Sequence, residues 1–213
     1  HFVLSDNKEL KTVATDSHRM SQKVITLEKN GDNFDVVIPS RSLREFTSVF
    51  SDDIETVEVF FANNQILFRS EHISFYTRLL EGNYPDTDRL IPTEFNTEAT
   101  FNVANLRFAM ERARLLSNAT QNGTVKLEFK NGVVSSHVHS PEVGRVNEEI
   151  DTSAVSGEDL SISFNPTYLI EALKAIDSEQ VVIRFISSVR PFTLVPEGNE
   201  QGFIQLITPV RTN

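Results

Sequence analysis

The chain has 213 residues, of which 39% are hydrophobic and 23% are charged, a balance typical of a folded protein that excludes a disordered one. Thirty acidic residues outnumber 20 basic ones, which argues against binding nucleic acid or an anionic membrane through the whole surface; one local basic face stays open. The absence of cysteine excludes disulfides, thiol catalysis and thiolate metal sites, and favours the cytoplasm. No apolar stretch approaches the roughly 20 residues that a membrane helix needs.

Most of the hydrophobic pattern has a period of two, which is typical of half-buried strands. Clear examples are residues 56–61, 125–129 and 161–164. The pairs Asn30-Gly31 and Asn131-Gly132 stand between such runs and predict tight hairpin turns, because both residue types tolerate positive φ. Asn63-Asn64 is a weaker signal of the same kind. We therefore expect antiparallel hairpins to dominate.

Three segments have apolar residues every three or four positions, which predicts short helices with one face on a sheet. They are residues 40–50, 103–116 and 166–176. These helices hold six basic and three acidic side chains within an acidic chain, so a face built from them would attract phosphates. The simpler alternative is that the arginines are ordinary exposed groups with partners four positions on, such as Arg107 with Glu111.

The chain also contains an internal repeat. Residues 38–45 align with residues 164–171, and the strand at 56–60 aligns with that at 182–186, an offset of 126 residues. A period of this length indicates duplicated domains rather than a solenoid of small units. Because a polar segment follows Pro92, we predict one domain at residues 1–95 and a second at 96–213. The first helix of the earlier copy is expected to lie before His1.

Three motifs in this order resemble a known family. They are VATDSHRM at residues 13–20, EGNYPD at 81–86 and ITPVR at 207–211. Together with the duplication, they resemble the bacterial DNA polymerase III β sliding clamps over the whole chain, as the middle domain without its beginning and the last domain. The resemblance implies an α+β fold of tandem clamp domains, with antiparallel sheets and short helices packed on one face. Ser17 stands where many relatives have Gly.

What the resemblance implies about function is a head-to-tail homodimeric ring that encircles duplex DNA without reading its sequence. Such a ring tethers the replicative polymerase and confers processivity. Its clients, which include the polymerase, the clamp loader and repair proteins, dock short Leu- and Phe-rich peptides in a cleft between the middle and last domains. The cleft residues carried over are Thr15, Ser17, His18, Arg19, Met20, Pro85, Arg89, Leu90, Asn165, Tyr168, Val189, Leu206, Ile207, Pro209, Val210 and Arg211.

Two further sets of residues follow from the resemblance. The side chains expected to face DNA are Arg41, Arg44, Arg107, Arg114 and Lys174. The ring contact is expected to include Leu115, Leu116, Glu142, Glu148 and Glu149. No catalytic residue, metal, cofactor or membrane contact is expected. The full-length protein should be a homodimer, and this chain, without a first domain, should be a monomer in the cytoplasm.

Two alternatives come from other functional classes. A metal-dependent hydrolase could use His137-Val138-His139, whose alternate spacing puts two rings on one strand face, or Asp16 near His18. No third ligand is placed by spacing, and no phosphate loop or nucleophile elbow is present in the sequence. The other alternative is a cytoplasmic peptide-binding scaffold that does not encircle DNA.

Overall fold

The computed structural model describes residues 1–6, 8–51, 53–117, 123–140, 144–198 and 202–211. The chain forms two compact units. Unit 1 consists of His1–Val13 and Val24–Asp86, and unit 2 consists of Ala14–Lys23 and Thr87–Asn213. Strands β2 (Glu9–Thr15) and β3 (Arg19–Thr26) therefore contribute residues to both units. The domain boundary after residue 95 stays a prediction.

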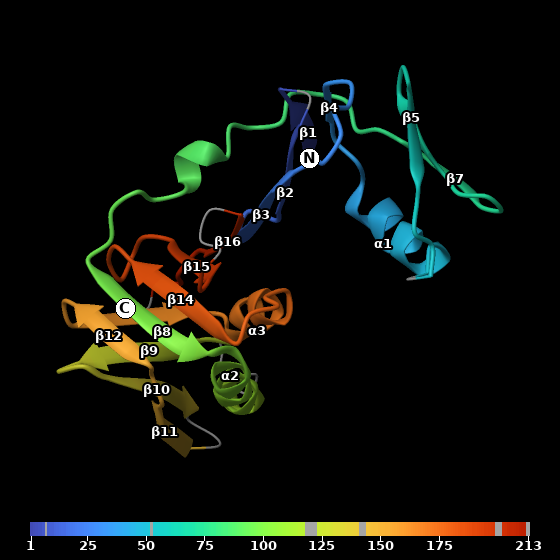
Figure 1. Ribbon diagram of the computed structural model, residues 1–213. Helices are drawn as coiled ribbons and strands as arrows, with labels where there is room; N and C mark the ends of the chain where they lie inside the picture. The colour runs from blue at the N-terminus through green and yellow to red at the C-terminus, as the bar shows by residue number, and fades with distance from the viewer. Residues whose placement is uncertain (7, 52, 118–122, 141–143, 199–201, 212–213) are drawn as a thin grey trace. The chain divides into compact units, whose positions relative to one another are not determined.

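Unit 1 consists of antiparallel strands and one helix (Figure 1). Strand β1 (Phe2–Ser5) pairs with β2 and with β4 (Phe34–Val36). Helix α1 (Ser40–Val49) follows, and the chain then forms a three-stranded meander. The meander strands are β5 (Glu58–Ala62), β6 (Gln65–Arg69) and β7 (Ser74–Arg78).

Aromatic rings join helix α1 to the meander of unit 1. The ring of Phe46 lies 4.7 Å from that of Phe68 and 6.2 Å from that of Phe75, and it stacks on Phe50 at 4.5 Å. The alternation of the strands places Phe68 and Phe75 opposite each other in the register of β6 and β7. The apolar stripe predicted for residues 40–50 thus faces the sheet, although no residue of α1 is fully buried.

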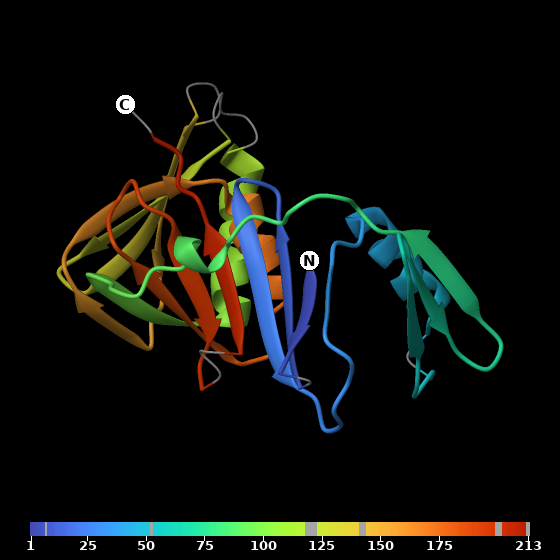
Figure 2. The same cartoon turned by 90° about the horizontal axis from the view of Figure 1, so that it is seen from above.

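The described residues of unit 2 form two α-helices and strands of two sheets. The strands of its larger sheet lie in the order β12 (Ala154–Gly157), β8 (Thr97–Asn102), β14 (Gln180–Phe185), β15 (Phe192–Pro196), β16 (Phe203–Ile207) and β3. The smaller sheet has the order β11 (Gly144–Ile150), β10 (Val133–Ser140), β9 (Val125–Lys130) and β13 (Leu160–Phe164). A single turn of 3₁₀ helix, η1 (Asp88–Leu90), precedes β8. Figures 1 and 2 show α2 (Val103–Ser117) and α3 (Pro166–Lys174) side by side.

The core of unit 2 lies between these helices and the sheets. The rings of Phe101, Phe164, Phe185 and Phe192 are fully buried. Helix α2 adds Leu106, Ala109, Met110 and Ala113, and α3 adds Leu169, Ile170 and Leu173. These are the apolar positions that the three-and-four spacing selects, and burying each large side chain contributes about 1.5–3 kcal/mol.

Strand pairing confirms the duplication and the α+β class. In the first copy β1 pairs with β2 and β4, and in the second copy β9 pairs with β10 and β13. In both copies a helix follows the short strand, and a three-stranded meander follows the helix. Helix α1 therefore corresponds to α3, and β5 corresponds to β14. The three predicted helices are all present at the predicted positions.

Two of the three predicted hairpin turns are confirmed, and one is wrong. Asn131 and Gly132, with φ of 51° and 78°, join β9 to β10, and Asn63-Asn64 joins β5 to β6. Asn30-Gly31 lies in a loop between β3 and β4, but β4 pairs with β1 and neither residue has positive φ. A Cβ on Gly31 would lie 2.9 Å from Leu4 Cδ2, the end of a flexible side chain that would then have to shift.

Candidate functional site

The motif at residues 15–20 forms a turn that its own side chains fix. The Thr15 hydroxyl donates to the Arg19 carbonyl oxygen at 2.8 Å, and Asp16 Oδ1 accepts from the backbone N–H groups of His18 and Arg19, each at 3.1 Å. Ser17 has φ of 71°, which lies in the left-handed region that favours glycine. The turn therefore presents His18 and Arg19 in one conformation.

Arg19 joins this turn to helix α3. Its Nε lies 2.9 Å from Asp16 Oδ2, its NH1 pairs with a carboxylate oxygen of Glu171, and its guanidinium lies 4.8 Å from the centre of the Tyr168 ring. Burial raises the pKa of Asp16, but the hydrogen bonds from Arg19 and His18 outweigh it and the net pKa is lowered. Burial lowers the pKa of Arg19, but its bonds to Glu171 and Asp16 raise the net pKa. Both groups therefore stay charged at neutral pH.

The Tyr168 ring has a second neighbour in the same turn. His18 stacks on it with a centroid distance of 5.9 Å and an interplanar angle of 15°. The residues of this constellation are Asp16, His18, Arg19, Tyr168 and Glu171, and we call it the Arg19 cluster. All five residues belong to unit 2.

The C-terminal segment lies next to the same turn. In the pairing of β3 with β16, Met20 is opposite Leu206 and Arg19 is opposite Ile207. The backbone N–H of Thr208 donates to the His18 carbonyl oxygen at 2.9 Å. The backbone N–H of Val210 donates to the carbonyl oxygen of Ser163 at 2.7 Å, which fixes the segment beside β13. The structure therefore brings together two motifs that are far apart in the sequence.

The predicted cleft residues differ in how much surface they offer. Met20, Leu206 and Ile207 are buried and belong to the core, whereas Leu90 and Val189 are each 52% exposed. Pro209 and Val210 are half-buried, and Arg89 and Arg211 are exposed. The exposed members could contact a ligand directly, and the buried ones support the surface.

Two other predicted cleft residues, Asn165 and Pro85, lie outside the β2–β3 turn and the C-terminal segment. Asn165 caps helix α3, because its Oδ1 accepts from the Thr167 N–H at 2.9 Å. Pro85 belongs to unit 1, and its place in the cleft stays a prediction. The sequence analysis missed Glu171 as a site residue. It is 152 positions from Arg19, and no local pattern links the two residues.

Two of the predicted DNA-facing side chains form ion pairs within their own helix. Arg41 Nε lies 3.0 Å from Glu45 Oε1, and Arg107 Nε lies 3.7 Å from Glu111 Oε1, as the simpler alternative expects for neighbours on a helix. The Arg107 Nε is nevertheless buried, and it donates no hydrogen bond to any of the described residues. The remaining members are Arg44 and Lys174, which are exposed, and Arg114, which is half-buried.

The predicted ring-contact residues lie on α2 and β11. Leu115 is 73% exposed and Leu116 is half-buried. Both guanidinium hydrogen bonds of Arg112 reach Glu148 and raise the pKa of Arg112. A pocket of about 240 Å³ is lined by residues of these two elements, including Glu148, Glu149 and Phe108. Phe108 is 48% exposed, and the sequence analysis missed it because the helical pattern expects a polar residue at this position. The predicted ring-contact residue Glu142 lies outside the described residues.

The residues suggested for a hydrolase do not form a metal site. The Nδ1 of His137 lies 2.8 Å from Asn147 Oδ1, and its Nε2 lies 2.8 Å from the Ser135 hydroxyl. Within the described ranges, no three His, Asp or Glu side chains are grouped so as to hold a metal ion. The same part of the chain has no helix of the length and apolarity needed to cross a bilayer.

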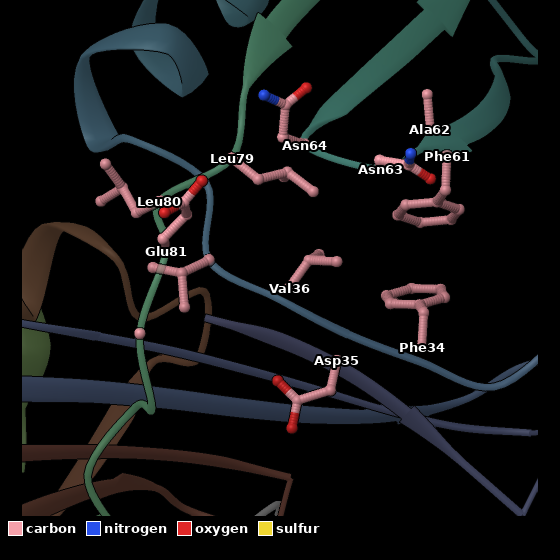
Figure 3. Close-up of a pocket in the computed structure, with 12 residues that line it drawn as sticks. Phe34, Asp35, Val36, Phe61, Ala62, Asn63, Asn64, Leu79, Leu80 and Glu81 are labelled. Atoms are coloured by element: carbon pink, nitrogen blue, oxygen red, sulfur yellow. The ribbon is translucent and has the colours of Figure 1, made fainter.

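Unit 1 has a pocket of about 400 Å³ between β4, the β5–β6 turn and the segment after β7 (Figure 3). The rings of Phe34 and Phe61 face each other across it, with centroids 4.6 Å apart, and Val36 and Leu79 also point toward the space. Asp35 points away from the space, and its carboxylate lies 2.7 Å from His1 Nε2. None of the predicted site residues lines this pocket.

Two family models match the chain. Residues 2–86 match the model described as the central domain of the DNA polymerase III beta subunit, and residues 88–211 match the model described as its C-terminal domain. The two matches meet within two residues of the division between units 1 and 2 after Asp86.

Curated relatives and solved structures agree with these matches. The chain is 80% identical over 213 residues to a beta sliding clamp of Streptococcus pneumoniae serotype 4, and 54% identical over 215 residues to one of Lactococcus lactis. These matches cover 100% of this chain and 56% and 57% of the relatives, so the chain spans little more than half their length. Among solved structures, the DNA polymerase III beta chain of S. pneumoniae has a TM-score of 0.97 at 80% identity, covering 99% of this chain and 56% of that one. The Bacillus subtilis DNA polymerase sliding clamp has a TM-score of 0.93 at 36% identity, covering 100% and 56%.

Proposed function

The chain belongs to the DNA polymerase III beta subunit family, and on that premise we propose that it is part of a sliding clamp that encircles duplex DNA and tethers the replicative polymerase. The family resemblance of the three motifs and the predicted clamp fold are thereby confirmed. The observation that carries the functional proposal is that the two units match consecutive domains of this family. The chain as a whole is also 80% identical to a beta sliding clamp. A clamp of this kind is a non-catalytic tether in the cytoplasm.

The proposed DNA contact uses the basic helix residues. Exposed arginine and lysine side chains neutralise phosphates without reading bases, which gives weak and mobile binding. The support in this chain is that six basic side chains gather on three helices of an otherwise acidic protein. We assign this role to Arg41, Arg44, Arg107, Arg114 and Lys174.

The proposed client site is the surface around the Arg19 cluster. It combines aromatic and aliphatic side chains, including Tyr168, Leu90 and Val189, with polar groups of the β2–β3 turn. Burying one Leu or Phe side chain of a peptide contributes about 1.5–3 kcal/mol, so two anchors and a few backbone bonds can reach the roughly −8 kcal/mol of micromolar binding. Such affinity allows clients to exchange.

The proposed ring contact is the outer face of α2 with the neighbouring β11. Leu115 and Phe108 expose apolar surface there, and the Arg112–Glu148 pair supplies charge beside it. An apolar centre with a charged rim is typical of a contact between subunits. We extend the predicted set of Leu115, Leu116, Glu148 and Glu149 by Phe108.

The decisive experiment uses the full-length protein on circular duplex DNA. A ring should remain on the circle after loading and leave when the DNA is cut once, whereas a peptide-binding scaffold should show no difference between circle and cut DNA. Replacing Arg107 and Arg114 by Ala should weaken retention and reduce the slope of log K against log salt by about two. Arg190→Ala, in the turn after β14, is the matched control and should leave the slope unchanged. Equal retention on circular and cut DNA contradicts the proposal.

A further inference from the structure

The pocket of unit 1 has a counterpart in the second copy of the repeat. In the first copy the backbone N–H of Leu80, after β7, donates to the carbonyl oxygen of Val37, after β4, at 2.8 Å. In the second copy the backbone N–H of Val210, after β16, donates to the carbonyl oxygen of Ser163, in β13, at 2.7 Å. The repeat offset of 126 residues relates Val37 to Ser163. The same backbone hydrogen bond therefore returns the chain to the strand before the helix in both copies.

The other walls of the pocket also have counterparts. The pocket is lined by the turn between β5 and β6 and by residues 79–82, which follow β7. In the second copy the corresponding segments are the β14–β15 loop, which contains Val189, and the residues after β16, which include Pro209, Val210 and Arg211. These four residues belong to the predicted cleft. The pocket is thus the unit 1 counterpart of that part of the cleft.

The lining of the pocket is apolar and partly open to solvent (Figure 3). The rings of Phe34 and Phe61 are in contact, with centroids 4.6 Å apart, and Val36 and Leu79 point toward the space beside them. Phe61 is 42% exposed and Leu80 is 55% exposed. The volume of about 400 Å³ lies in the range of small-ligand pockets. A Leu or Phe side chain from another molecule would cover this apolar surface and be stabilised by leaving water.

The charge at the pocket is negative. Asp35 and Glu81 line it, and none of the described lining residues is basic. The side chain of Asp35 is 71% exposed although it binds His1 Nε2, and Glu81 is exposed. Glu81 comes directly after the hydrogen-bonded residue of its copy, whereas Arg211 holds that position in the second copy. A peptide with a basic residue beside its apolar anchor therefore complements the pocket in shape and in charge.

We propose that this pocket is a second peptide-binding site, which takes a Leu or Phe side chain flanked by Lys or Arg. The site goes beyond the client site of unit 2, because it needs only the apolar lining and the two carboxylates of unit 1. Peptides with the same anchor and acidic flanks are repelled by Asp35 and Glu81.

Photo-crosslinking locates the bound peptide. The probe is an acetylated and amidated peptide in which lysines flank leucine and benzoylphenylalanine, and mass spectrometry identifies the crosslinked residues. Crosslinks are expected within residues 34–37, 61–64 and 79–82, both in this chain and in the full-length protein. A second probe with glutamates in place of the lysines should give about a fivefold lower yield at these residues at low salt. The difference between the probes should shrink as salt is added.

Two variants change the pocket, and each has a matched control. Phe61→Ala removes part of the apolar wall and should lower the yield with both probes about fivefold, whereas Val59→Ala, on the same face of β5, 44% exposed and outside the pocket, should not. Glu81→Lys should lower the yield with the lysine probe about fivefold and raise the yield with the glutamate probe. Glu71→Lys makes the same charge change in the exposed β6–β7 turn and should alter neither yield. Circular dichroism at the assay temperature establishes that each variant is folded.

The outcomes separate this site from the proposed clamp function. Crosslinks confined to unit 2 overturn the site in unit 1 and leave the client site standing. Crosslinks in unit 1 of this chain but not of the full-length protein mean that another segment covers the pocket, which also overturns it. Equal losses in Phe61→Ala and Val59→Ala, or in Glu81→Lys and Glu71→Lys, have the same meaning. A failure of the circular-DNA experiment would leave the crosslinks in unit 1 unchanged.

Discussion

The two copies of the repeated motif differ in burial far more than in secondary structure. Helix α3 buries five side chains, whereas the corresponding helix α1 buries none. Strand β14 buries four of its six residues, whereas all five residues of β5 are exposed. The reason is the neighbours: β14 pairs with β8 and β15, but β5, within the described part of unit 1, pairs with β6 alone. A sequence pattern thus predicts whether a segment forms a helix or a strand. The elements that pack against that segment determine how much it contributes to the stability of the fold.

The largest expected effect contrasts one phenylalanine from each copy. Phe185 on β14 is fully buried and contacts the rings of Phe129 and Phe192, so Phe185→Ala should lower the free energy of unfolding by about 3–5 kcal/mol. Phe61 on β5 is 42% exposed, so Phe61→Ala should cost about 1 kcal/mol. Urea unfolding followed by circular dichroism measures both. If both variants lost the same free energy of unfolding, the exposure of Phe61 on β5 would not reflect its contribution to stability.

A smaller effect concerns the residue that precedes each helix. Asn165 caps α3 through its side chain, whereas Pro39 precedes α1 without a side-chain cap bond. Asn165→Ala should therefore cost about 1 kcal/mol, and Asn165→Asp should cost little because aspartate also accepts the Thr167 N–H. Pro39→Ser adds a hydroxyl acceptor at α1 and should cost less than Asn165→Ala. Thermal unfolding decides the order, and a larger loss at Pro39 would contradict it.

The smallest effect concerns the pH dependence of the ion pairs that join α3 to the β2–β3 turn, Asp16–Arg19 and Arg19–Glu171. Among the described residues, α1 has no corresponding pairs. The folded-state pKa of Asp16 lies below its usual 3.8, so its stabilising contribution is present above that pH and is lost as the pH falls through the lower folded-state value. Because this side chain is 47% exposed, the contribution is at most a few tenths of a kcal/mol.

The comparison of Asp16→Asn with the unmodified chain tests this dependence. The variant should have the lower thermal midpoint at pH 7, and the difference should shrink as the pH falls below 3.8 and through the lower folded-state pKa of Asp16. Asp177→Asn, at an exposed position after α3, is the control and should show no such dependence. A difference that persists unchanged at low pH would exclude ionisation of Asp16 as its cause.

Local patterns predicted most of the fold. The helices and many strands follow from spacing within a few residues, and the Asn131-Gly132 turn follows from backbone preferences. The Asn30-Gly31 turn was wrong because β4 pairs with β1 and not with β3, and a local pattern does not show which distant strands pair. The exposed β5 could not be predicted either, since its alternation matches that of the buried β14.

The candidate site was predictable only in part. The first and third motifs identified the β2–β3 turn and the C-terminal segment, and the structure places these two segments side by side. The ion pair of Glu171 with Arg19 depends on a distance between two segments, which no periodicity reveals. The burial of Met20, Leu206 and Ile207 likewise depends on packing that single positions do not specify.

The division of β2 and β3 between the units has a consequence for protein dissection. A single cut between Asp86 and Thr87 would leave Ala14–Lys23, with His18 and Arg19, on the fragment opposite the one that carries Tyr168 and Glu171. Neither half would then hold a complete Arg19 cluster, and β16 would lose β3, one of the two strands with which it pairs. The chain is therefore a natural candidate for fragment complementation, in which peptide binding returns only when both halves reassemble.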